Sequence, residues 1–290
     1  MHFVKAKGIL SAKNGMNIYR GCTHGCIYCD SRSNCYGMNH PFEDIEVKEN
    51  APLLLEKILS RKKIKCMVST GSMCDPYMHC EKELMLTRQC LEIIEKHGFG
   101  ACIQTKSDLI LRDIDLLERI NKKSKCVVQM TLTTYDEEVC QALEPNVCTT
   151  KERYGVLKEL QKRGIPTIVW ISPLLPYIND TEENLRGILD YCFDAGVKGI
   201  VCFGIGTTMR DGSREYFYSQ LDKILPGLKK VYARKYGHSY ECLSDENDRL
   251  MRIFHEECHK HKVMHRVDKI FDYLEKYECK VAENEQISMF

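Results

Sequence analysis

The most informative absences concern membranes and charge. The sequence has no run of 18 apolar residues, so it contains no candidate for a membrane-spanning helix. Its first residues, Met1 to Lys7, carry no apolar stretch of the kind that a secretory signal peptide needs. The net charge is only +1, so composition alone points to no polyanionic partner. We therefore predict a cytoplasmic protein that makes no use of a membrane.

Internal repeats and low-complexity tracts are also absent, which argues against a repeat array. The 290 residues include 43% hydrophobic and 29% charged residues. That composition is enough for a sizeable core, in one large domain or in two small ones.

Cysteine, by contrast, is abundant, with 17 residues. Many of these cysteines lie inside apolar runs, as Cys102, Cys126 and Cys202 do. An odd number of cysteines in such positions is typical of buried thiols in a reducing compartment. A disulfide framework is therefore not expected.

Cys22, Cys26 and Cys29 form the one compact group, with the spacing C-x3-C-x2-C. A closed structural zinc site or an ordinary iron–sulfur cluster takes four protein ligands, so three leave one metal position open. Thiolates select zinc or iron–sulfur over magnesium and calcium. Two interpretations follow: a metal centre that carries out chemistry, or three cysteines that hold zinc with an outside ligand.

Strand-like and helix-like segments alternate along the chain. Strands are expected at 16–20, 66–70, 101–105, 126–134, 167–171 and 199–203, and helices at 51–61, 81–97, 110–121, 149–163, 181–195 and 213–224. Apolar strands separated by helices indicate a parallel sheet covered by helices. We predict an α/β fold, a partial (β/α)6 TIM-like barrel, with its chemistry at the C-terminal ends of the strands.

Residues 226–290 break this alternation. Helices are expected at 228–236, 245–262 and 266–279, and no strand is evident. We predict a barrel core with an N-terminal lead-in over 1–225 and a helical C-terminal extension over 226–290 that packs on it. His255, Cys258 and His259 share one face of a tail helix, where packing is favoured over an accessory metal site.

Wider patterns around the cysteines resemble one family. Tyr28 precedes the last cysteine, and further short motifs follow in order: Cys74-Asp75-Pro76-Tyr77, Thr87-Arg88, Thr105-Lys106-Ser107, Arg112-Asp113, Glu144-Pro145, Pro173-Leu174-Leu175-Pro176 and Asn179-Asp180. From about residue 16 to residue 206 the chain resembles the spore photoproduct lyase-like, DNA repair photolyase-type and mobile-pair-like branch of the radical S-adenosylmethionine (SAM) superfamily. The helical tail is less diagnostic.

The resemblance implies an enzyme in which Cys22, Cys26 and Cys29 hold a [4Fe–4S] cluster whose fourth iron binds SAM. One electron would cleave SAM to methionine and a 5′-deoxyadenosyl radical, which would abstract hydrogen from the substrate. It also implies an electron donor of flavodoxin or ferredoxin type.

A nucleic-acid lesion is the first candidate substrate, and a peptide or small molecule is the alternative. Basic stretches at 57–65 and 229–235 suit a phosphate backbone or a merely solvated face. The rival from another class is a non-catalytic module in which the cysteines bind metal or the chain binds nucleic acid.

The same resemblance assigns contacts to SAM. Tyr28 would hold the adenine end, Gly71 and Ser72 the methionine end, and Lys106 the carboxylate as a point charge. Each has an ordinary alternative: a packed ring, a simple turn, a solvated lysine. Asp75 could hold a cation or cap a helix, and strand threonines could face ribose or only favour the strand. The predicted cofactor-binding residues are Tyr28, Gly71, Ser72, Asp75, Lys106, Gln129, Thr131, Thr133 and Pro173.

Cys74 is the predicted catalytic residue. In spore photoproduct lyases a cysteine on this loop returns a hydrogen atom to the product radical. Here the offset between Cys74 and the following aspartate differs, and Ser72 falls nearer the donor's position. This mismatch leaves open both the hydrogen-return step and the thymine dimer of spores as substrate.

Overall fold

A computed structural model describes residues 1–280, and residues 281–290 of the predicted extension lie outside the described part. The strands are β1 (His2–Val4), β2 (Gly15–Met16), β3 (Tyr19–Arg20), β4 (Glu46–Lys48), β5 (Met67–Thr70), β6 (Gly100–Thr105), β7 (Cys126–Thr131), β8 (Thr167–Trp170), β9 (Gly199–Val201), β10 (Gly206–Thr208) and β11 (Glu241–Leu243).

The α-helices are α1 (Ala51–Leu59), α2 (Glu81–Leu84), α3 (Leu86–Lys96), α4 (Ile114–Lys123), α5 (Glu137–Leu143), α6 (Thr150–Lys162), α7 (Glu182–Asp194), α8 (Ser213–Ile224), α9 (Leu228–Tyr236), α10 (Asn247–Lys260) and α11 (Val267–Glu275). Short 3-10 helices are η1 (Asp30–Arg32), η2 (Asn34–Tyr36) and η3 (Asp108–Asp113). Across residues 1–280 we find no helix with the length and hydropathy that a membrane crossing requires.

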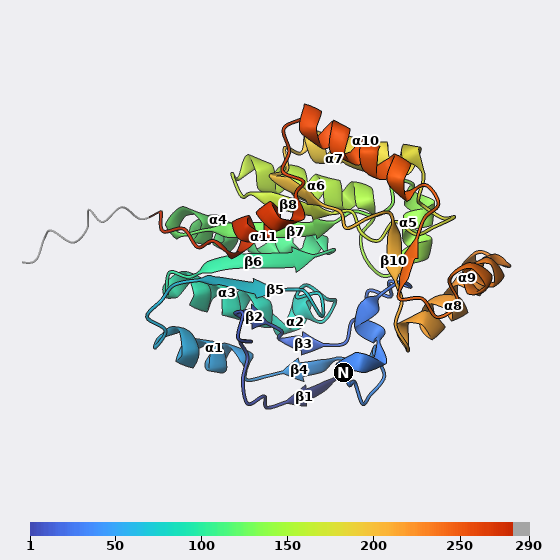
Figure 1. Ribbon diagram of the computed structural model, residues 1–290. Helices are drawn as coiled ribbons and strands as arrows, with labels where there is room; N and C mark the ends of the chain where they lie inside the picture. Colours follow the sequence, from blue (N-terminus) through green and yellow to red (C-terminus); the bar gives the residue numbers. More distant parts are fainter. Residues whose placement is uncertain (281–290) are drawn as a thin grey trace, which may run out of the picture.

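A six-stranded sheet forms the centre of the molecule, with the order β2-β5-β6-β7-β8-β9. Every neighbouring pair is parallel, and β5, β6 and β7 point toward the side where β10 lies (Figure 1). Strands buried on both faces read as continuous apolar runs, which is why the sequence predicts them well. The predicted alternation of six strands with helices is confirmed.

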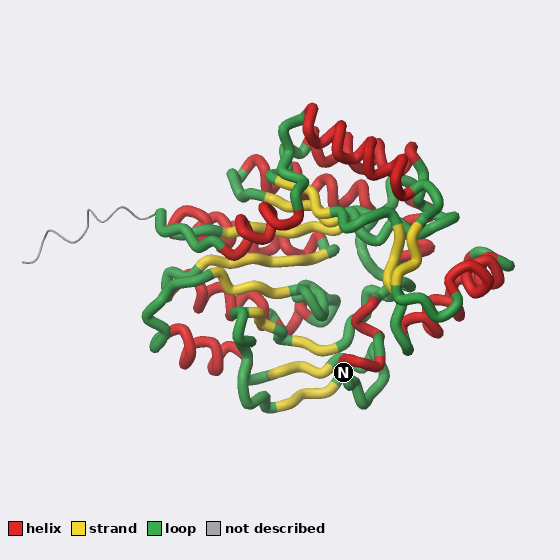
Figure 2. Tube along the Cα trace, viewed as in Figure 1, coloured by secondary structure: helices red, strands yellow, loops and turns green. Residues whose placement is uncertain are grey.

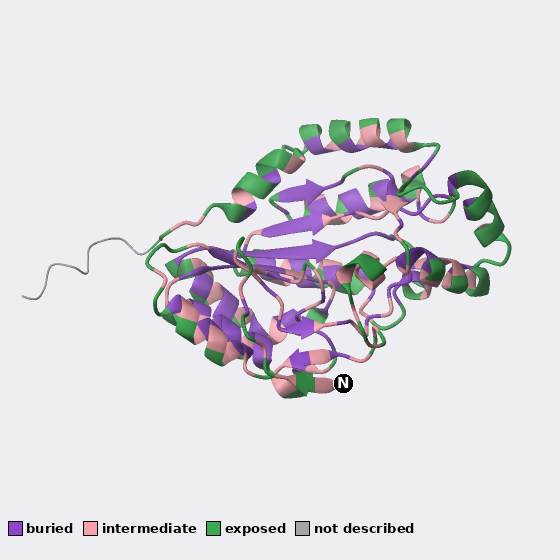
Figure 3. Cartoon of the chain, turned by 60° about the horizontal axis from the view of Figure 1, so that its bottom comes forward, coloured by how far each residue is buried: buried purple, intermediate pink, exposed green. Residues whose placement is uncertain are grey.

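The outer face of this sheet packs against helices with apolar stripes. Leu91 of α3, Leu117 of α4, Leu157 of α6 and Leu189 of α7 belong to one core cluster with outward-facing strand residues such as Val128. This cluster covers the convex side of the sheet and leaves the opposite side for the site. The strands of the central sheet are almost entirely buried (Figure 3).

The inner face of the sheet is partly covered by the C-terminal helix. Ile270 and Leu274 of α11 pack against Cys102, Val127 and Ile168, which alternate along their strands with the outward-facing residues. These contacts are near the N-terminal ends of the strands. The interior therefore stays open only toward the C-terminal ends, where the predicted site residues lie.

Short strands account for most departures from the predicted elements. The lead-in 1–15 contains β1, and 31–50 contains β4, which pairs with β1 in parallel and with β3 in antiparallel fashion. The expected strand 16–20 is split between the central sheet and this three-stranded sheet (Figure 2). Strands of two or three residues are too short to carry a periodic signal.

Two helical expectations are also corrected. The helix expected at 81–97 is broken at Met85, which has a positive φ of 52° and separates α2 from α3. Helix α5 has no counterpart among the predicted elements.

The tail contains a strand that the sequence did not reveal. Strand β11 pairs antiparallel with β10, and α9 packs against α8, so contacts cross the boundary placed at 225. The three predicted tail helices are present as α9, α10 and α11. The division into a core and an extension stays a prediction.

Candidate active site

The three cysteines of the short motif line one small cavity. Cys22, Cys26 and Cys29 follow β3, all three thiols are free, and Cys26 is buried. The cavity has a volume of about 140 Å³, and its other walls are the ends of β5, β6 and β7. A fourth cysteine, Cys74, also lines this cavity, but its thiol donates to the carbonyl of Tyr19. The three remaining thiols suit a cluster with one open metal position.

Backbone hydrogen bonds hold this cysteine loop from two sides. The amide of Cys22 donates to the carbonyl of Phe42 at 3.1 Å, and the amide of Ile27 donates to that of Leu143 at 3.0 Å. The backbone amide of Asn146 donates to the carbonyl of His24 at 3.1 Å. The loop is thus fixed by segments far away in the sequence.

Tyr28 is anchored by a buried ion pair. Its hydroxyl donates to Glu144, and the other carboxylate oxygen of Glu144 pairs with Arg153. The Arg153 side chain is 0% exposed and also donates to the carbonyls of Thr131 and Cys148, at 2.9 Å each. Burial raises the pKa of Glu144, and Arg153 opposes that shift. The network joins the cysteine loop to the end of β7.

Sequence reasoning missed most of this network. In the sequence, Glu144 stands out only as part of a family motif, and no pattern marks Arg153. Arg153 lies in α6 among other charged residues, so nothing local distinguishes it from a solvated side chain. A signal does exist in the capping box of Thr149 and Glu152, because it places the start of α6 and hence Arg153 in its first turns.

Asp75 joins the loop after β5 to the end of β6. Its Oδ1 accepts from the Thr105 hydroxyl at 2.7 Å and from the Tyr77 amide at 2.9 Å. Its Oδ2 accepts from the Lys106 amide at 2.7 Å and lies 3.5 Å from Nδ1 of His24. Asp75 does not cap α2, because that helix begins well past it without a side-chain cap. These contacts make it a positioning residue at the cavity wall.

Gly71 lies where two backbone segments approach closely. Its φ is +101°, and a Cβ atom there would lie 1.9 Å from the carbonyl oxygen of Gln104. Only glycine can occupy this position without displacing β6. Gly71 and Ser72 both line the small cavity, and their contact with SAM stays a prediction.

A second, larger cavity of about 770 Å³ continues from the first. The wall shared by the two consists of Tyr28, Cys29, Ser31, Ser72 and Lys106. The Lys106 ammonium lies over the ring of Tyr28, 5.7 Å from its centroid. The open metal position would therefore face the larger cavity, with the Lys106 ammonium where the two cavities meet.

The far side of the larger cavity is aromatic and apolar. Trp170 and Phe203, whose ring centroids are 5.8 Å apart, lie there beside Pro173, Leu243 and Met251. Phe203 is 62% exposed, which is unusual for phenylalanine. The antiparallel pair of β10 and β11, which the sequence did not predict, supplies part of this wall.

Three predicted contact residues lie at different depths. Thr131 lines the small cavity. Gln129 lies deeper, where it accepts from the Trp170 indole at 2.8 Å and donates to Cys102 at 3.1 Å. Thr133 is buried, and its carbonyl accepts from Asn179 and Asn184. Neither Gln129 nor Thr133 is on the wall of either cavity, and their contact with SAM stays a prediction.

Cys74 lines the small cavity, and its thiol already makes a hydrogen bond. The thiol donates to the carbonyl of Tyr19 at 2.8 Å, and the residue is 6% exposed. Burial raises the pKa of Cys74 to about 12. Ser72, by contrast, lines both cavities. The catalytic assignment of Cys74 stays a prediction.

Among the described residues, the tail residues His255, Cys258 and His259 do not form a group that could bind a metal ion. Cys258 is 0% exposed within the main core, whereas His255 and His259 are exposed. The packing role favoured from the apolar stripe agrees with this arrangement for Cys258.

Comparisons with known proteins agree with this geometry. Residues 16–192 match the family described as the Radical SAM superfamily. An uncharacterized protein of Methanocaldococcus jannaschii is 35% identical over 240 residues, which are 82% of each chain. An uncharacterized protein of Mycobacterium tuberculosis H37Rv is 28% identical over 227 residues, or 76% of this chain and 66% of that protein.

A protein of Pseudomonas phage M6 called radical SAM Nalpha-GlyT isomerase is 25% identical over 180 residues, or 62% of this chain and 36% of its own length. Among solved structures, a spore photoproduct lyase mutant with bound AdoMet and dinucleoside spore photoproduct has a TM-score of 0.60 at 13% identity, covering 86% of this chain and 74% of that one. At that identity the likeness concerns the fold, and it confirms the predicted partial barrel.

Proposed function

The chain belongs to the radical SAM superfamily, and from this premise we propose that it removes a hydrogen atom from a nucleic-acid substrate held in the larger cavity. The observation that carries the proposal is the continuity of the two cavities. Three free thiols line the inner one, and the outer one, with a volume of about 770 Å³, shares five wall residues with it. Membership of an enzyme family sets aside the non-catalytic module.

Cys22, Cys26 and Cys29 would hold the [4Fe–4S] cluster of this family. When bound, the cluster and SAM together supply a 5′-deoxyadenosyl radical for hydrogen abstraction. The chain's own residues bind and orient the reactants. Lys106 places a point charge where a carboxylate of SAM would enter, and the network of Tyr28, Glu144 and Arg153 keeps the cysteine loop in place.

The substrate class rests on the aromatic wall and on relatives. Trp170 and Phe203 offer ring faces to a planar group, and base–aromatic stacking tolerates any base. The spore photoproduct lyase structures contain a dinucleoside spore photoproduct. We propose that this chain acts on a nucleobase or base lesion, with a flavodoxin or ferredoxin as its electron donor and the cytoplasm as its compartment.

A peptide or another small molecule is the second candidate substrate, and one observation favours it. The larger cavity carries few charges: Lys106, Glu241 and the Asp30 carboxylate that pairs with Arg210. The predicted basic stretches do not line it. A long polyanion would therefore gain little along this wall.

The first experiment is anaerobic reconstitution followed by reduction with dithionite. We expect about four irons per chain and release of 5′-deoxyadenosine from added SAM. Iron well below that number, or no 5′-deoxyadenosine, would refute the family chemistry for this chain.

The second experiment separates the substrate classes. Binding of a fluorescent single-stranded oligonucleotide is measured over a series of salt concentrations. A nucleic-acid enzyme should lose affinity steeply as salt rises, because phosphate contacts release counterions. Binding without a salt slope would favour the peptide or small-molecule candidate.

A further inference from the structure

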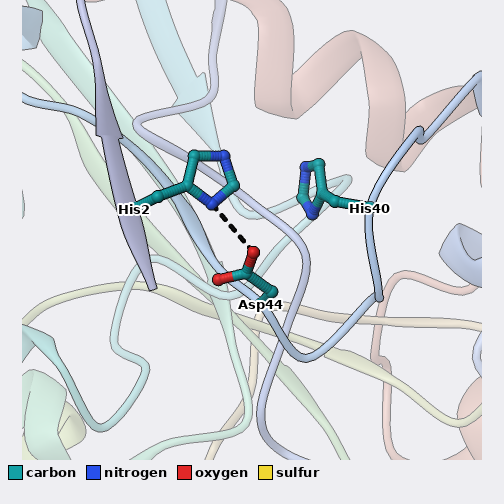
Figure 4. Close-up of side chains that lie close together, drawn as sticks. All are labelled: His2, His40 and Asp44. Atoms are coloured by element: carbon teal, nitrogen blue, oxygen red, sulfur yellow. Dashed lines mark hydrogen bonds and ion pairs between the residues drawn. The ribbon is translucent and has the colours of Figure 1, made fainter.

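Three metal-ligating side chains gather away from the cysteine loop. His2 lies on β1, and His40 and Asp44 lie on the loop between η2 and β4, with both rings directed toward the carboxylate (Figure 4). One ligand atom from each residue lies within 4.8 Å of the other two. Nδ1 of His2 is 3.0 Å from Oδ2 of Asp44, while Oδ1 of Asp44 is 2.7 Å from the amino group of Met1.

One nitrogen of the His40 ring is unmatched within residues 1–280. Its Nδ1 lies 3.1 Å from the carbonyl oxygen of Pro41, which can only accept a hydrogen bond. In the neutral ring this places the proton on Nδ1 and the lone pair on Nε2. Within residues 1–280, Nε2 is buried from solvent and has no hydrogen-bond partner. A buried lone pair left unmatched is unfavourable, and a cation would satisfy it.

A fourth donor stands beside the group. Glu46 of β4 is in register with His2 of β1, so strand pairing places the two side by side. Oε2 of Glu46 lies 3.9 Å from Nε2 of His40, and its side chain is 20% exposed. Glu46 thus lies next to a group of two imidazoles and one carboxylate at the edge of one small sheet.

We propose that His2, His40 and Asp44 bind a zinc ion, with Glu46 as the nearest fourth ligand. Imidazole nitrogen together with carboxylate suits zinc, whereas magnesium and calcium prefer oxygen ligands alone. Neighbouring ligands of a tetrahedral zinc lie about 3.3 Å apart, so small side-chain rotations would close the group around the ion. The ion would take the place of the hydrogen bond between His2 and Asp44.

The position of this site suggests what the ion does. The loop that carries His40 and Asp44 also contains Phe42, whose carbonyl accepts from the amide of Cys22 at 3.1 Å. A Cβ atom on Gly21 would lie 2.4 Å from that same oxygen, so the loop and the cysteine segment fit tightly. Zinc would hold the loop from its outer side and thereby stabilise the backbone that leads into the cluster.

The test measures zinc and iron separately on the full-length chain without a histidine tag. The protein with reconstituted cluster is equilibrated with zinc chloride, passed through a desalting column and analysed for both elements. We expect about one zinc per chain in the wild type and at least a tenfold weaker zinc affinity in His40→Gln. The matched control is His238→Gln, since His238 is an exposed histidine outside the group.

Thermal unfolding provides the second readout. Saturating zinc should raise the Tm of the wild type by about 5 °C and should leave the Tm of His40→Gln unchanged. If His40→Gln does not fold, Asp44→Asn replaces it. Equal zinc retention and equal Tm shifts in the wild type and the variant, or no zinc in the wild type, would overturn the proposal. Iron content and 5′-deoxyadenosine release report on the proposed enzyme activity instead, so the two proposals fail independently.

Discussion

The cofactor half of the cavity is held by buried polar contacts, whereas the opposite half is an open aromatic and apolar wall. Around the cysteine loop, the side chains of Asp75, Glu144 and Arg153 have hydrogen bonds on several atoms. On the opposite side of the larger cavity, Phe203 is 62% exposed, and short strands form part of the wall. Cluster chemistry needs one fixed geometry, while a substrate wall can vary without loss of the fold.

The largest expected effect is on the cofactor half. In Cys26→Ala we expect iron content to collapse and 5′-deoxyadenosine release to fall by more than the roughly 100-fold that loss of an outer-shell partner costs at a metal site. Iron analysis and chromatography of the nucleoside measure both. The control is Cys35→Ala, which removes an exposed cysteine and should keep both values. Equal behaviour of the two variants would contradict the ligand assignment.

The next effect concerns stability of the same half. Arg153→Met leaves the 1% exposed carboxylate of Glu144 without its partner, so we expect the free energy of unfolding to fall by about 3–5 kcal/mol. Denaturant unfolding measures it. Arg186→Met removes an exposed arginine from ion pairs with Glu182 and Glu257 and should change stability little. A loss in Arg153→Met no greater than in this control would mean that the buried network is unimportant.

A smaller effect is expected at the boundary between the halves. Lys106→Gln removes the positive charge where the two cavities meet. It should weaken SAM binding by about tenfold and leave the iron content unchanged. Equilibrium dialysis with labelled SAM measures the affinity. Lys230→Gln, an exposed lysine on α9, should bind SAM as the wild type does. Unaltered affinity in Lys106→Gln would favour the solvated-lysine interpretation.

The smallest effect is predicted for the open half. Phe203→Ala should weaken oligonucleotide binding by about fivefold, since one stacked base is worth ~1–3 kcal/mol. Release of 5′-deoxyadenosine without substrate should stay unchanged, because Phe203 lies away from the cysteines. Phe3→Ala is the matched control, because Phe3 is 52% exposed on β1. Weaker binding in both variants alike would remove Phe203 from the substrate wall.

The sequence predicted the strands of the central sheet because their signal is local. The three cysteines gather for the same reason, and their role as cluster ligands stays a prediction. A buried parallel strand is a continuous apolar run, and the thiols of Cys22, Cys26 and Cys29 are brought together by short spacing alone. The strand ends at Gly71 and Lys106 followed from the same alternation. Short strands such as β11 and the break at Met85 were missed, since pairing and backbone conformation there depend on distant partners.

The site contacts divide in the same way. Tyr28 and Asp75 were identified as site residues, but their partners were not, because Glu144 and Thr105 are remote in sequence. The group of His2, His40 and Asp44 gives no metal signal in the sequence, since the pairing of β1 with β4 is what brings His2 to the other two.

The sequence by itself determined the class of fold and the superfamily, because buried strands and short motifs are each recognised from residues close along the chain. The open metal position stays a prediction. The tertiary structure alone decided which partners hold Tyr28 and Asp75, and which wall faces the open position. Those features depend on contacts between distant segments. Tyr28 and Glu144, for example, are 116 residues apart in the sequence. Such contacts form only when distant segments are brought together by the alignment of the strands. No local sequence pattern therefore predicts them.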